Sequence, residues 1–326
     1  MFNLFEKRLK YLVIGAGSTG AAFACFLHSA NKNVTLISKY ESIIKTAEEK
    51  GGIRLISNVK GDKRYKIKIK TEQSYNEKAD VIILCVRTPD IPSTVQLIKK
   101  ASKKHTILFS ISNGFGIGYA LSQKFKNLNI LDANFVGKCR WYNRQEAEYL
   151  QQREYCELNF ADINNNINPK ILNKIKNDFT QAGMNTSYLT EQQFTELSFE
   201  RLITRSPFEA CCIYYNICAN EFEGEKRETF EKLCNELLIL AKAMNINVRK
   251  DFLQEYYENF ELYKQRDDAN IYSSILNDMK IGQNSEIDFL FFIVTELAKK
   301  YNVNLPTYFK IAEKFKEYNT LQNYLN

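Results

Sequence analysis

The sequence contains little histidine and no cysteines in the C-x-x-C spacing. Its 326 residues include two isolated histidines, His28 and His105, and eight cysteines, none of which form a C-x-x-C motif. Without C-x-x-C pairs and with isolated histidines, we expect neither a zinc site nor a disulfide framework and no bound metal. We expect buried thiols in a reducing compartment. We expect the adjacent Cys211 and Cys212 to pack in the core; the alternative is that they form a redox-active pair.

Long apolar runs and targeting signals are also missing. The longest apolar run, residues 289–294, is much shorter than the roughly 18 residues that span a bilayer. Residues 1–10 are mixed in polarity and charged, unlike a signal peptide. From these absences we expect a cytoplasmic protein with no membrane partner.

Neither sign of charge dominates the chain. The net charge of +7 is modest and spread along the sequence. Residues 60–70 alternate charged side chains with Tyr65, Ile67 and Ile69, which predicts a two-faced edge strand and not a nucleic-acid-binding arm. We therefore expect small anionic ligands and no nucleic-acid partner.

The most informative feature that is present is a glycine-rich turn. An apolar stretch, residues 11–14, leads into G-x-G-x-x-G, and a helical pattern follows. This context is typical of dinucleotide binding, with Gly15 allowing the turn, Gly17 the approach of a pyrophosphate and Gly20 close helix packing. The helix start would offer its N–H groups to phosphate. The expected cofactor residues are Gly15, Ala16, Gly17, Ser18, Thr19 and Gly20; the alternative is a turn without a ligand.

Strand and helix patterns alternate through the first half of the chain. Apolar stretches predict strands at residues 11–14, 33–37, 53–55, 64–69, 79–86, 106–110, 129–133 and 184–189, with helices between them. This alternation predicts an α/β fold with an N-terminal, doubly wound parallel sheet of the Rossmann type over residues 1–190. Helical periodicity then takes over at residues 199–220, 227–244, 250–264 and 274–301 and after Pro306. We expect an all-helical C-terminal domain over residues 191–326.

The end of the second predicted strand bears on the choice of cofactor. The residues after it are Ser38, Lys39, Tyr40 and Glu41. An acidic residue there would bind the ribose hydroxyls of NAD, whereas Lys39 would neutralise the 2′-phosphate of NADP. We favour NADP, with NAD held by Glu41 as one alternative and Lys39 as a solvated surface residue as another.

Two further loops follow predicted strands. Arg87 comes after residues 79–86, and Asn113 with Gly114 comes after residues 106–110. Ligands of such sheets bind beyond the carboxyl ends of the strands. We expect Arg87 and Asn113 to contact the cofactor, and Asn113 also to donate to a substrate carbonyl or carboxylate. Ordinary turn chemistry is the alternative for both.

In this order, the motifs resemble the ketopantoate reductase (2-dehydropantoate 2-reductase) family over nearly the whole chain. The resemblance rests on the glycine turn, Lys39, Arg87, the Asn113-Gly114 pair, Ser273-Ser274-Ile-Leu-Asn-Asp278, and Ser285-Glu286-Ile287-Asp288. The spacing of twelve residues from Ser274 to Glu286 is its most specific part.

The resemblance implies an activity. In this family NADPH reduces the C2 carbonyl of ketopantoate to give pantoate, a step toward pantothenate and coenzyme A. A lysine early in the helical domain donates the proton, and asparagine, serine and glutamate side chains hold the substrate. It implies a substrate-binding role for Ser274 and a catalytic-site role for Glu286. Without the resemblance, Glu286 would be expected only to cap a helix, as would Asp278.

The chain departs from the family at that lysine. An ungapped match places Arg201 at the lysine and Arg205 and Glu209 at two asparagines, all on one helical face, although Pro207 leaves the register open. Arginine is a poor proton donor. Arg201 could polarise the carbonyl, leaving water or another side chain to supply the proton. It could instead form a carboxylate clamp with Arg205 for a changed substrate, or Arg205 and Glu209 could be a structural ion pair.

The leading expectation is NADPH-dependent reduction of ketopantoate, with a small-molecule 2-oxo acid as the partner and a monomer or homodimer as the assembly. One alternative is a related reductase of another 2-oxo acid or of an imine, as in opine dehydrogenases. Those enzymes use a histidine, and the second half of this chain has none. The other alternative is a non-catalytic NADP-binding sensor.

Overall fold

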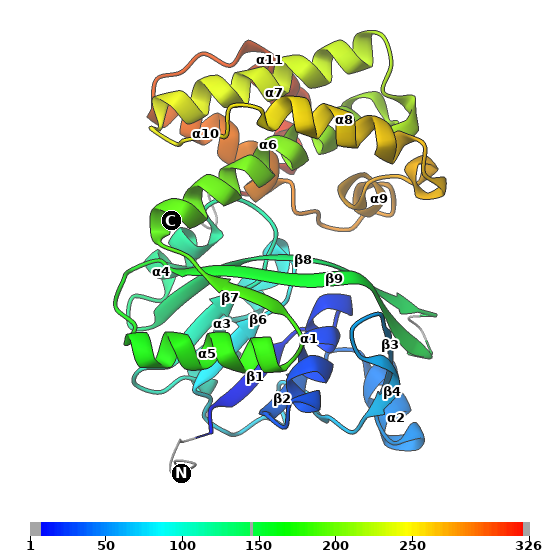
Figure 1. Ribbon diagram of the computed structural model, residues 1–326, viewed down its shortest axis with the longest axis vertical. Helices are drawn as coiled ribbons and strands as arrows, with labels where there is room; N and C mark the ends of the chain where they lie inside the picture. The colour runs from blue at the N-terminus through cyan, green and yellow to red at the C-terminus, as the bar shows by residue number, and fades with distance from the viewer. Residues whose placement is uncertain (1–7, 144–145, 322–326) are drawn as a thin grey trace. The chain divides into compact units, whose positions relative to one another are not determined.

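A computed structural model of the chain describes residues 8–143 and 146–321 (Figure 1). Residues 1–7, within the segment expected to lack a signal peptide, and 322–326, the end of the predicted second domain, lie outside the described residues. Two compact units are present, one comprising Met1–Val86, Asp90–Ser112 and Leu121–Glu191, the other Arg87–Pro89, Asn113–Ala120 and Gln192–Asn326. Over the described residues, no helix combines the length and apolarity required to cross a bilayer.

The first unit contains a single sheet with helices packed on it. Its strands are β1 (Lys10–Ile14), β2 (Asn33–Ile37), β3 (Ile53–Ser57), β4 (Gly61–Tyr65), β5 (Lys68–Lys70), β6 (Val81–Leu84), β7 (Ile107–Ser110), β8 (Asn129–Tyr142), β9 (Tyr149–Asp162) and β10 (Asn185–Tyr188). Its main helices are α1 (Ser18–Ser29), α2 (Glu41–Lys50), α3 (Ile91–Ala101) and α5 (Pro169–Gln181), and α4 (Ile117–Lys124) crosses the unit boundary.

The sheet is mixed, which corrects the expectation of a purely parallel one. Its strand order is β4-β3-β9-β8-β7-β6-β1-β2-β5, with β10 paired to β9. Neighbours are parallel except for β8 with β9 and β3 with β4, which are antiparallel. The loop between Tyr142 and Tyr149 is too short for a crossover connection, so β8 and β9 form a hairpin. The α/β class with helices in the C-terminal half is confirmed.

The charged stretch at residues 60–70 forms two strands, where the sequence predicts one. Ile67 N–H donates to the Tyr65 carbonyl at 3.0 Å, and this tight turn separates β4 from β5. The two strands then occupy opposite ends of the strand order. The sheet is therefore curled, because its two margins are joined by only two residues.

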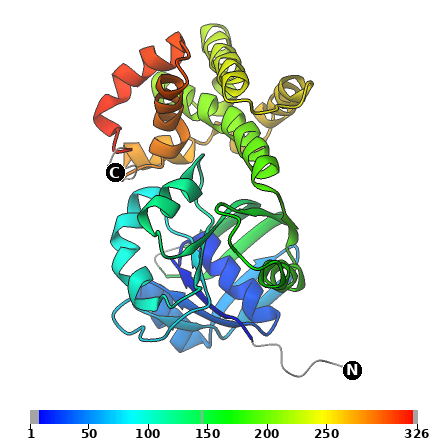
Figure 2. The same cartoon turned by 90° about the vertical axis from the view of Figure 1, so that its left-hand side faces the viewer.

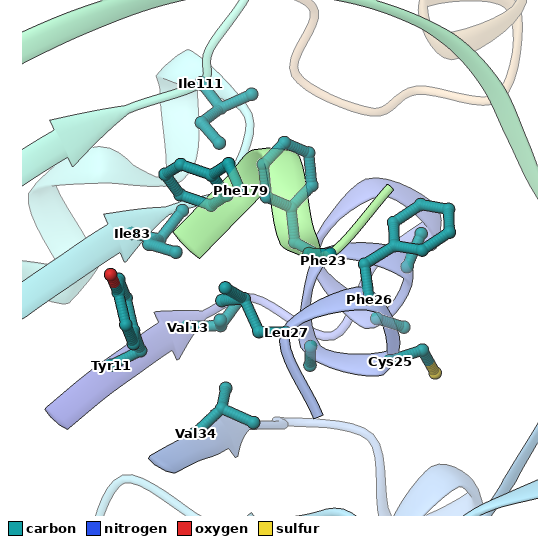
Figure 3. Close-up of a cluster of buried hydrophobic side chains, with 14 of the residues drawn as sticks. Tyr11, Val13, Phe23, Cys25, Phe26, Leu27, Val34, Ile83, Ile111 and Phe179 are labelled. Atoms are coloured by element: carbon teal, nitrogen blue, oxygen red, sulfur yellow. The ribbon is translucent and has the colours of Figure 1, made fainter. Parts of the chain in front are cut away.

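Helix α1 lies at the centre of this unit. Its residues 20–27 are all buried, so the helix is apolar on every side. Phe23 packs edge-on against Phe135 of β8 and Phe179 of α5, with ring centroids 4.9 and 5.9 Å apart (Figure 3). Val13 of β1 lies close to Leu27 on its other side. Since strands and α5 surround the helix, its N-terminal end is held firmly against the end of β1.

The regular secondary structure of the second unit is all helical over its described residues. Its helices are α6 (Glu191–Tyr215), α7 (Glu225–Ala243), α8 (Phe252–Lys264), α9 (Ser274–Lys280), α10 (Ile293–Lys300) and α11 (Pro306–Phe315). Helices α7, α10 and α11 pack against one another (Figure 2). Helix α6 continues through Pro207, and the neighbouring Ser206 Oγ accepts a hydrogen bond from Tyr308 Oη of α11 at 3.0 Å.

The single helix expected over residues 274–301 is interrupted. Helix α9 ends before Gly282, whose φ of +69° is left-handed. A π-helical segment, Asp288–Phe292, then precedes α10. Asp288 accepts a hydrogen bond from Thr320 N, so this turn also anchors the chain after α11. The interruption frees residues 281–287 from helical geometry, and Glu286 lies in that stretch.

Candidate active site

The glycine turn of the first unit has two glycines that its own packing requires. Gly15 has a φ of +105°, and a Cβ atom there would lie 2.8 Å from the Cys85 carbonyl oxygen. A Cβ at Gly20 would lie 1.9 Å from the Gly15 carbonyl oxygen. In contrast, a Cβ at Gly17 would meet nothing within 4 Å among the described residues. Only Gly17 therefore faces open space, where a ligand could approach the backbone.

The surroundings of Gly17 fit a diphosphate. Helix α1 begins at Ser18, and Gly17 at its N-cap offers no capping side chain, so the first N–H groups remain available. Gly17, Ser18 and Thr19 are partly exposed, whereas Ala16 is buried. Trp141 of β8 fixes the turn from one side, with Nε1 donating to the Ala16 carbonyl at 3.2 Å. The turn is thus rigid, electropositive and accessible, as a phosphate site at a helix N-terminus should be.

Lys39 lies at the end of β2, as predicted, and is 68% exposed. Its Nζ is 3.7 Å from Asp90 Oδ1. The hydroxyl of neighbouring Ser38 is engaged with the backbone of Tyr40, and Glu41 is the first residue of α2, where the helix dipole favours a carboxylate. Lys39 and Glu41 are both exposed, so the contact of Lys39 with a 2′-phosphate and the alternative of a ribose held by Glu41 both stay predictions.

In the second unit, Arg87 is held by an ion pair. Its Nη1 donates to Asp278 Oδ2 of α9 at 2.8 Å. Asp278, expected to be a turn or cap residue, therefore has a specific partner from the loop that follows β6. The predicted cofactor contact of Arg87 stays a prediction.

A pocket in the second unit brings three of the predicted site residues together. It is lined by Asn113, Gly114, Ser198, Arg201, Leu202, Arg205 and Leu290. Arg201 and Arg205 are one turn apart on α6. Arg201 Nη2 donates to Asn113 Oδ1 at 3.2 Å, and Arg205 Nη2 donates to Glu209 Oε1 at 2.8 Å. Two guanidinium groups and one amide thus converge on the pocket, and one guanidinium is paired with a buried carboxylate.

The electrostatics of this pocket favour an anionic ligand. Burial, together with the charge of Arg205, lowers the pKa of Arg201 to about 10, so its side chain stays charged at neutral pH. Burial raises the pKa of Glu209, and the charge of Arg205 opposes that shift. A bound carboxylate or oxyanion would relieve the repulsion between the two arginines.

Glu286 lies beside Asn113 and the loop after β6. Its carboxylate oxygen Oε1 accepts a hydrogen bond from Thr88 N at 3.4 Å, and its carboxylate is also hydrogen-bonded by the Asn113 side chain. Burial raises the pKa of Glu286 to about 7, and these two hydrogen bonds oppose the shift. Glu286 can therefore exist in both protonation states near neutral pH.

The π-helical segment positions Asn113 through backbone atoms. Phe115 N donates to the Phe289 carbonyl at 2.8 Å. Gly114 has a φ of +137°, and a Cβ there would lie 2.5 Å from Phe289 Cβ. Only glycine permits this approach, which explains the Asn113-Gly114 pair. No sequence rule marks Phe289 or Thr88, because both act through main-chain atoms that carry no side-chain signature.

The pocket does not include Ser274. This residue is exposed at the first position of α9. Its neighbour Ser273 is buried, caps α9 by accepting from Leu276 N at 3.3 Å, and lies next to Glu209 and Cys212. A serine directly before a helix is a capping signal that the sequence offered. The substrate-binding role of Ser274 stays a prediction.

Neither a metal site nor a reactive thiol pair is found among the residues that the structure describes. Over the described residues, no cluster of three or more His, Cys, Asp or Glu side chains could hold a metal ion. All eight cysteines are unpaired and six are buried. Burial raises the pKa values of Cys211 and Cys212, so these thiols are unreactive and pack in the core, as expected.

Comparisons with protein-family models and with known proteins point to the same family. The family model described as "Ketopantoate reductase PanE/ApbA" matches residues 11–161, and "Ketopantoate reductase PanE/ApbA C terminal" matches residues 193–319. A 2-dehydropantoate 2-reductase of Lactococcus lactis is 22% identical over 307 residues, covering 91% of this chain and 94% of that protein.

Solved structures share the fold. A 2-dehydropantoate 2-reductase from Methylococcus capsulatus has a TM-score of 0.78 at 17% identity, covering 95% of this chain and 96% of that one. A D-mandelate dehydrogenase solved with NADH and anilino(oxo)acetate has a TM-score of 0.76 at 18% identity, covering 94% and 98%. The two matched regions together extend over most of the sequence, and the chain belongs to the ketopantoate reductase PanE/ApbA family.

Proposed function

We propose that this protein is an NADPH-dependent reductase of 2-oxo acids and that ketopantoate is its substrate. The observation that carries the proposal is the hydrogen bond from Arg201 to Asn113 in a pocket shared with Arg205. Family membership supplies the reaction class, and this pocket supplies donors for a carboxylate and for a carbonyl oxygen.

The cofactor would be held mainly by the first unit. The N–H groups at Gly17–Gly20 would bind its diphosphate, with the 2′-phosphate near Lys39. Arg87 and Asn113 follow strands β6 and β7 in the chain, and they would contact the nicotinamide end. When bound, NADPH supplies a hydride for the carbonyl carbon.

The substrate would be held by the pocket of the second unit. Arg205 has N–H groups besides the one bonded to Glu209, and a planar guanidinium suits a carboxylate. Arg201 would polarise the carbonyl and stabilise the negative charge that develops on its oxygen. Asn113 would orient that oxygen.

The test is turnover by the purified protein. NADPH and NADH are each offered with ketopantoate and with a panel of 2-oxo acids that includes an aromatic one, and loss of reduced cofactor is followed. We expect the highest kcat/KM with NADPH and ketopantoate. Binding of NADPH without turnover of any 2-oxo acid would contradict the proposal and favour a sensor.

A second candidate is reduction of a different 2-oxo acid. The replacement of the family's lysine by Arg201 favours it, because two arginines can clamp a carboxylate that the family's residues would hold differently. The structurally similar D-mandelate dehydrogenase acts within the same fold. A higher kcat/KM for the aromatic acid than for ketopantoate would support this candidate.

We also propose a cytoplasmic location and a monomeric or homodimeric state. Eight unpaired thiols support a reducing compartment. Analytical ultracentrifugation distinguishes the two assemblies.

A further inference from the structure

The proposed reduction requires a proton, and the residue at the family's lysine position does not supply it readily. With its pKa lowered to about 10, Arg201 is protonated at neutral pH, but the Glu286 carboxyl, with its pKa raised to about 7, is the much stronger acid. The other candidate proton donors are the acidic side chains of the site, Glu209, Asp278 and Glu286. Glu209 is buried against Arg205, and Asp278 is paired with Arg87. Glu286 is the acid that shares Asn113 with Arg201.

We infer that Glu286 gives the proton to the substrate oxygen and that Asn113 holds the two groups side by side. This inference rests on the proposed function and assigns the step that the missing lysine leaves open.

The orientation of Asn113 carries the argument. Its Oδ1 accepts from Arg201 Nη2, so its Nδ2 must face Glu286 and donate to the carboxylate. The second N–H of Nδ2 is then available to a carbonyl oxygen polarised by Arg201. Two acceptors on one amide nitrogen lie about 5 Å apart or closer, which a direct contact or one water molecule spans.

The surroundings of Glu286 suit a proton donor. The Thr88 N–H and the Asn113 amide hold the carboxyl in place. The charges of Arg87 and Arg205 favour its ionised form, but Asp278 pairs with the first and Glu209 with the second. Burial therefore prevails, and the pKa of the carboxyl is raised to about 7. An acid with this pKa is half-protonated at the pH of a cell.

The step balances without another reactant. The carbonyl carbon receives the hydride that NADPH supplies, and the electron pair of the C=O bond moves to oxygen. That oxygen takes the proton of the Glu286 carboxyl and becomes a hydroxyl. The carboxylate regains a proton from water, so the sum is ketone, NADPH and a proton giving alcohol and NADP⁺.

The experiment compares pH profiles of wild type, Glu286→Gln and the control Glu313→Gln, whose side chain is exposed on α11. Because the acid must be protonated, wild-type kcat should fall about tenfold per pH unit above pH 7. Glu286→Gln should lower kcat at least about 100-fold, change KM little and remove the pH dependence. Glu313→Gln should behave as wild type. A ¹³C-NMR titration of labelled glutamate, with the Glu286 signal identified by its loss in Glu286→Gln, should give a midpoint near 7 without turnover.

The outcomes separate the two proposals. The inference is overturned if Glu286→Gln turns over at the wild-type rate with an unchanged pH profile. It is also overturned if this variant has a raised KM at normal kcat, which leaves a substrate-holding role for Glu286. A midpoint near 4.5 in the titration also overturns it. No turnover of any 2-oxo acid by wild type overturns the proposed function itself, and the inference with it.

Discussion

An ungapped match places Arg201 at the family's lysine, and this exchange changes what the side chain can do. A guanidinium remains charged, donates several hydrogen bonds in a plane and rarely gives up a proton. In this pocket it bonds to Asn113, with a second guanidinium one helical turn away. At the scale of the residue, we propose that stabilisation of the oxygen's charge is separated here from delivery of the proton, two tasks that one lysine can combine.

Substitution of Arg201 tests the first task. Arg201→Ala should reduce kcat about 100- to 1000-fold, because a donor to the developing oxyanion is lost. Arg201→Lys should keep activity within about tenfold of wild type, since a charge and a donor remain. Steady-state kinetics with NADPH and the preferred 2-oxo acid measure both. Near-normal kcat in Arg201→Ala would exclude the polarising role.

Lys39 bears on the choice of cofactor. Lys39→Ala should weaken NADPH binding about tenfold and leave NADH binding within about twofold, because only NADPH carries the 2′-phosphate. Cofactor fluorescence titration measures the two dissociation constants. Lys45→Ala, an exposed lysine on α2 paired with Glu49, is the matched control. Equal losses for NADPH and NADH would show that Lys39 does not read the phosphate.

Site residues were predictable where a spacing or position rule applied to side chains. The four-residue spacing predicted that Arg201 and Arg205 share a helical face, and both line one pocket. The rule for strand ends singled out Asn113, which lines the same pocket. Thr88 and Phe289 were not predictable, because their contribution is a backbone N–H and a backbone carbonyl. Ser274 faces solvent, whereas the preference for serine directly before a helix applies to its buried neighbour Ser273.

At the scale of elements, the turn between β1 and α1 makes the clearest demand on sequence. Gly20→Ala would place a Cβ 1.9 Å from the Gly15 carbonyl oxygen, so the start of α1 must shift. Gly17→Ala meets open space at a φ of −65°. We expect Gly20→Ala to lower Tm by several degrees. Gly17→Ala should keep Tm close to wild type and weaken NADPH binding at least about tenfold, since its methyl group blocks the approach of the diphosphate.

Calorimetry and cofactor titration of the two glycine variants provide the measurements. Normal NADPH affinity in a folded Gly17→Ala protein would show that the diphosphate does not lie over this turn.

Elements with a strong apolar pattern were predicted well, and elements with mixed patterns were not. Strands β1, β6 and β7 are buried on both faces and stand out in the sequence. Strand β9 contains four consecutive polar or charged residues, 151–154, and its pairing with β8 comes from a hairpin that the composition does not mark. The split of residues 274–301 depends on a left-handed Gly282 and on contacts of Asp288 with Thr320 that are distant in sequence.

At the scale of the whole molecule, the net charge of +7 should assist an anionic cofactor. Raising ionic strength from about 0.05 to about 0.5 M should increase KM for NADPH several-fold and leave kcat nearly unchanged, because screening weakens attraction before binding and not the buried chemistry. Steady-state kinetics across a salt series measure this. A salt-independent KM would show that the excess charge does not act on the cofactor.

The two margins of the curled sheet have a consequence for behaviour at high concentration. An exposed edge strand has backbone N–H and C=O groups without hydrogen-bond partners, and these can pair with an edge strand of another molecule. Repeated pairing of this kind leads to fibrils. Here β4 carries exposed Lys63 and Arg64, and β5 carries Lys68. A second copy of the chain that approached β4 or β5 edge to edge would bring like positive charges together. This repulsion disfavours strand pairing between copies and therefore the growth of fibrils.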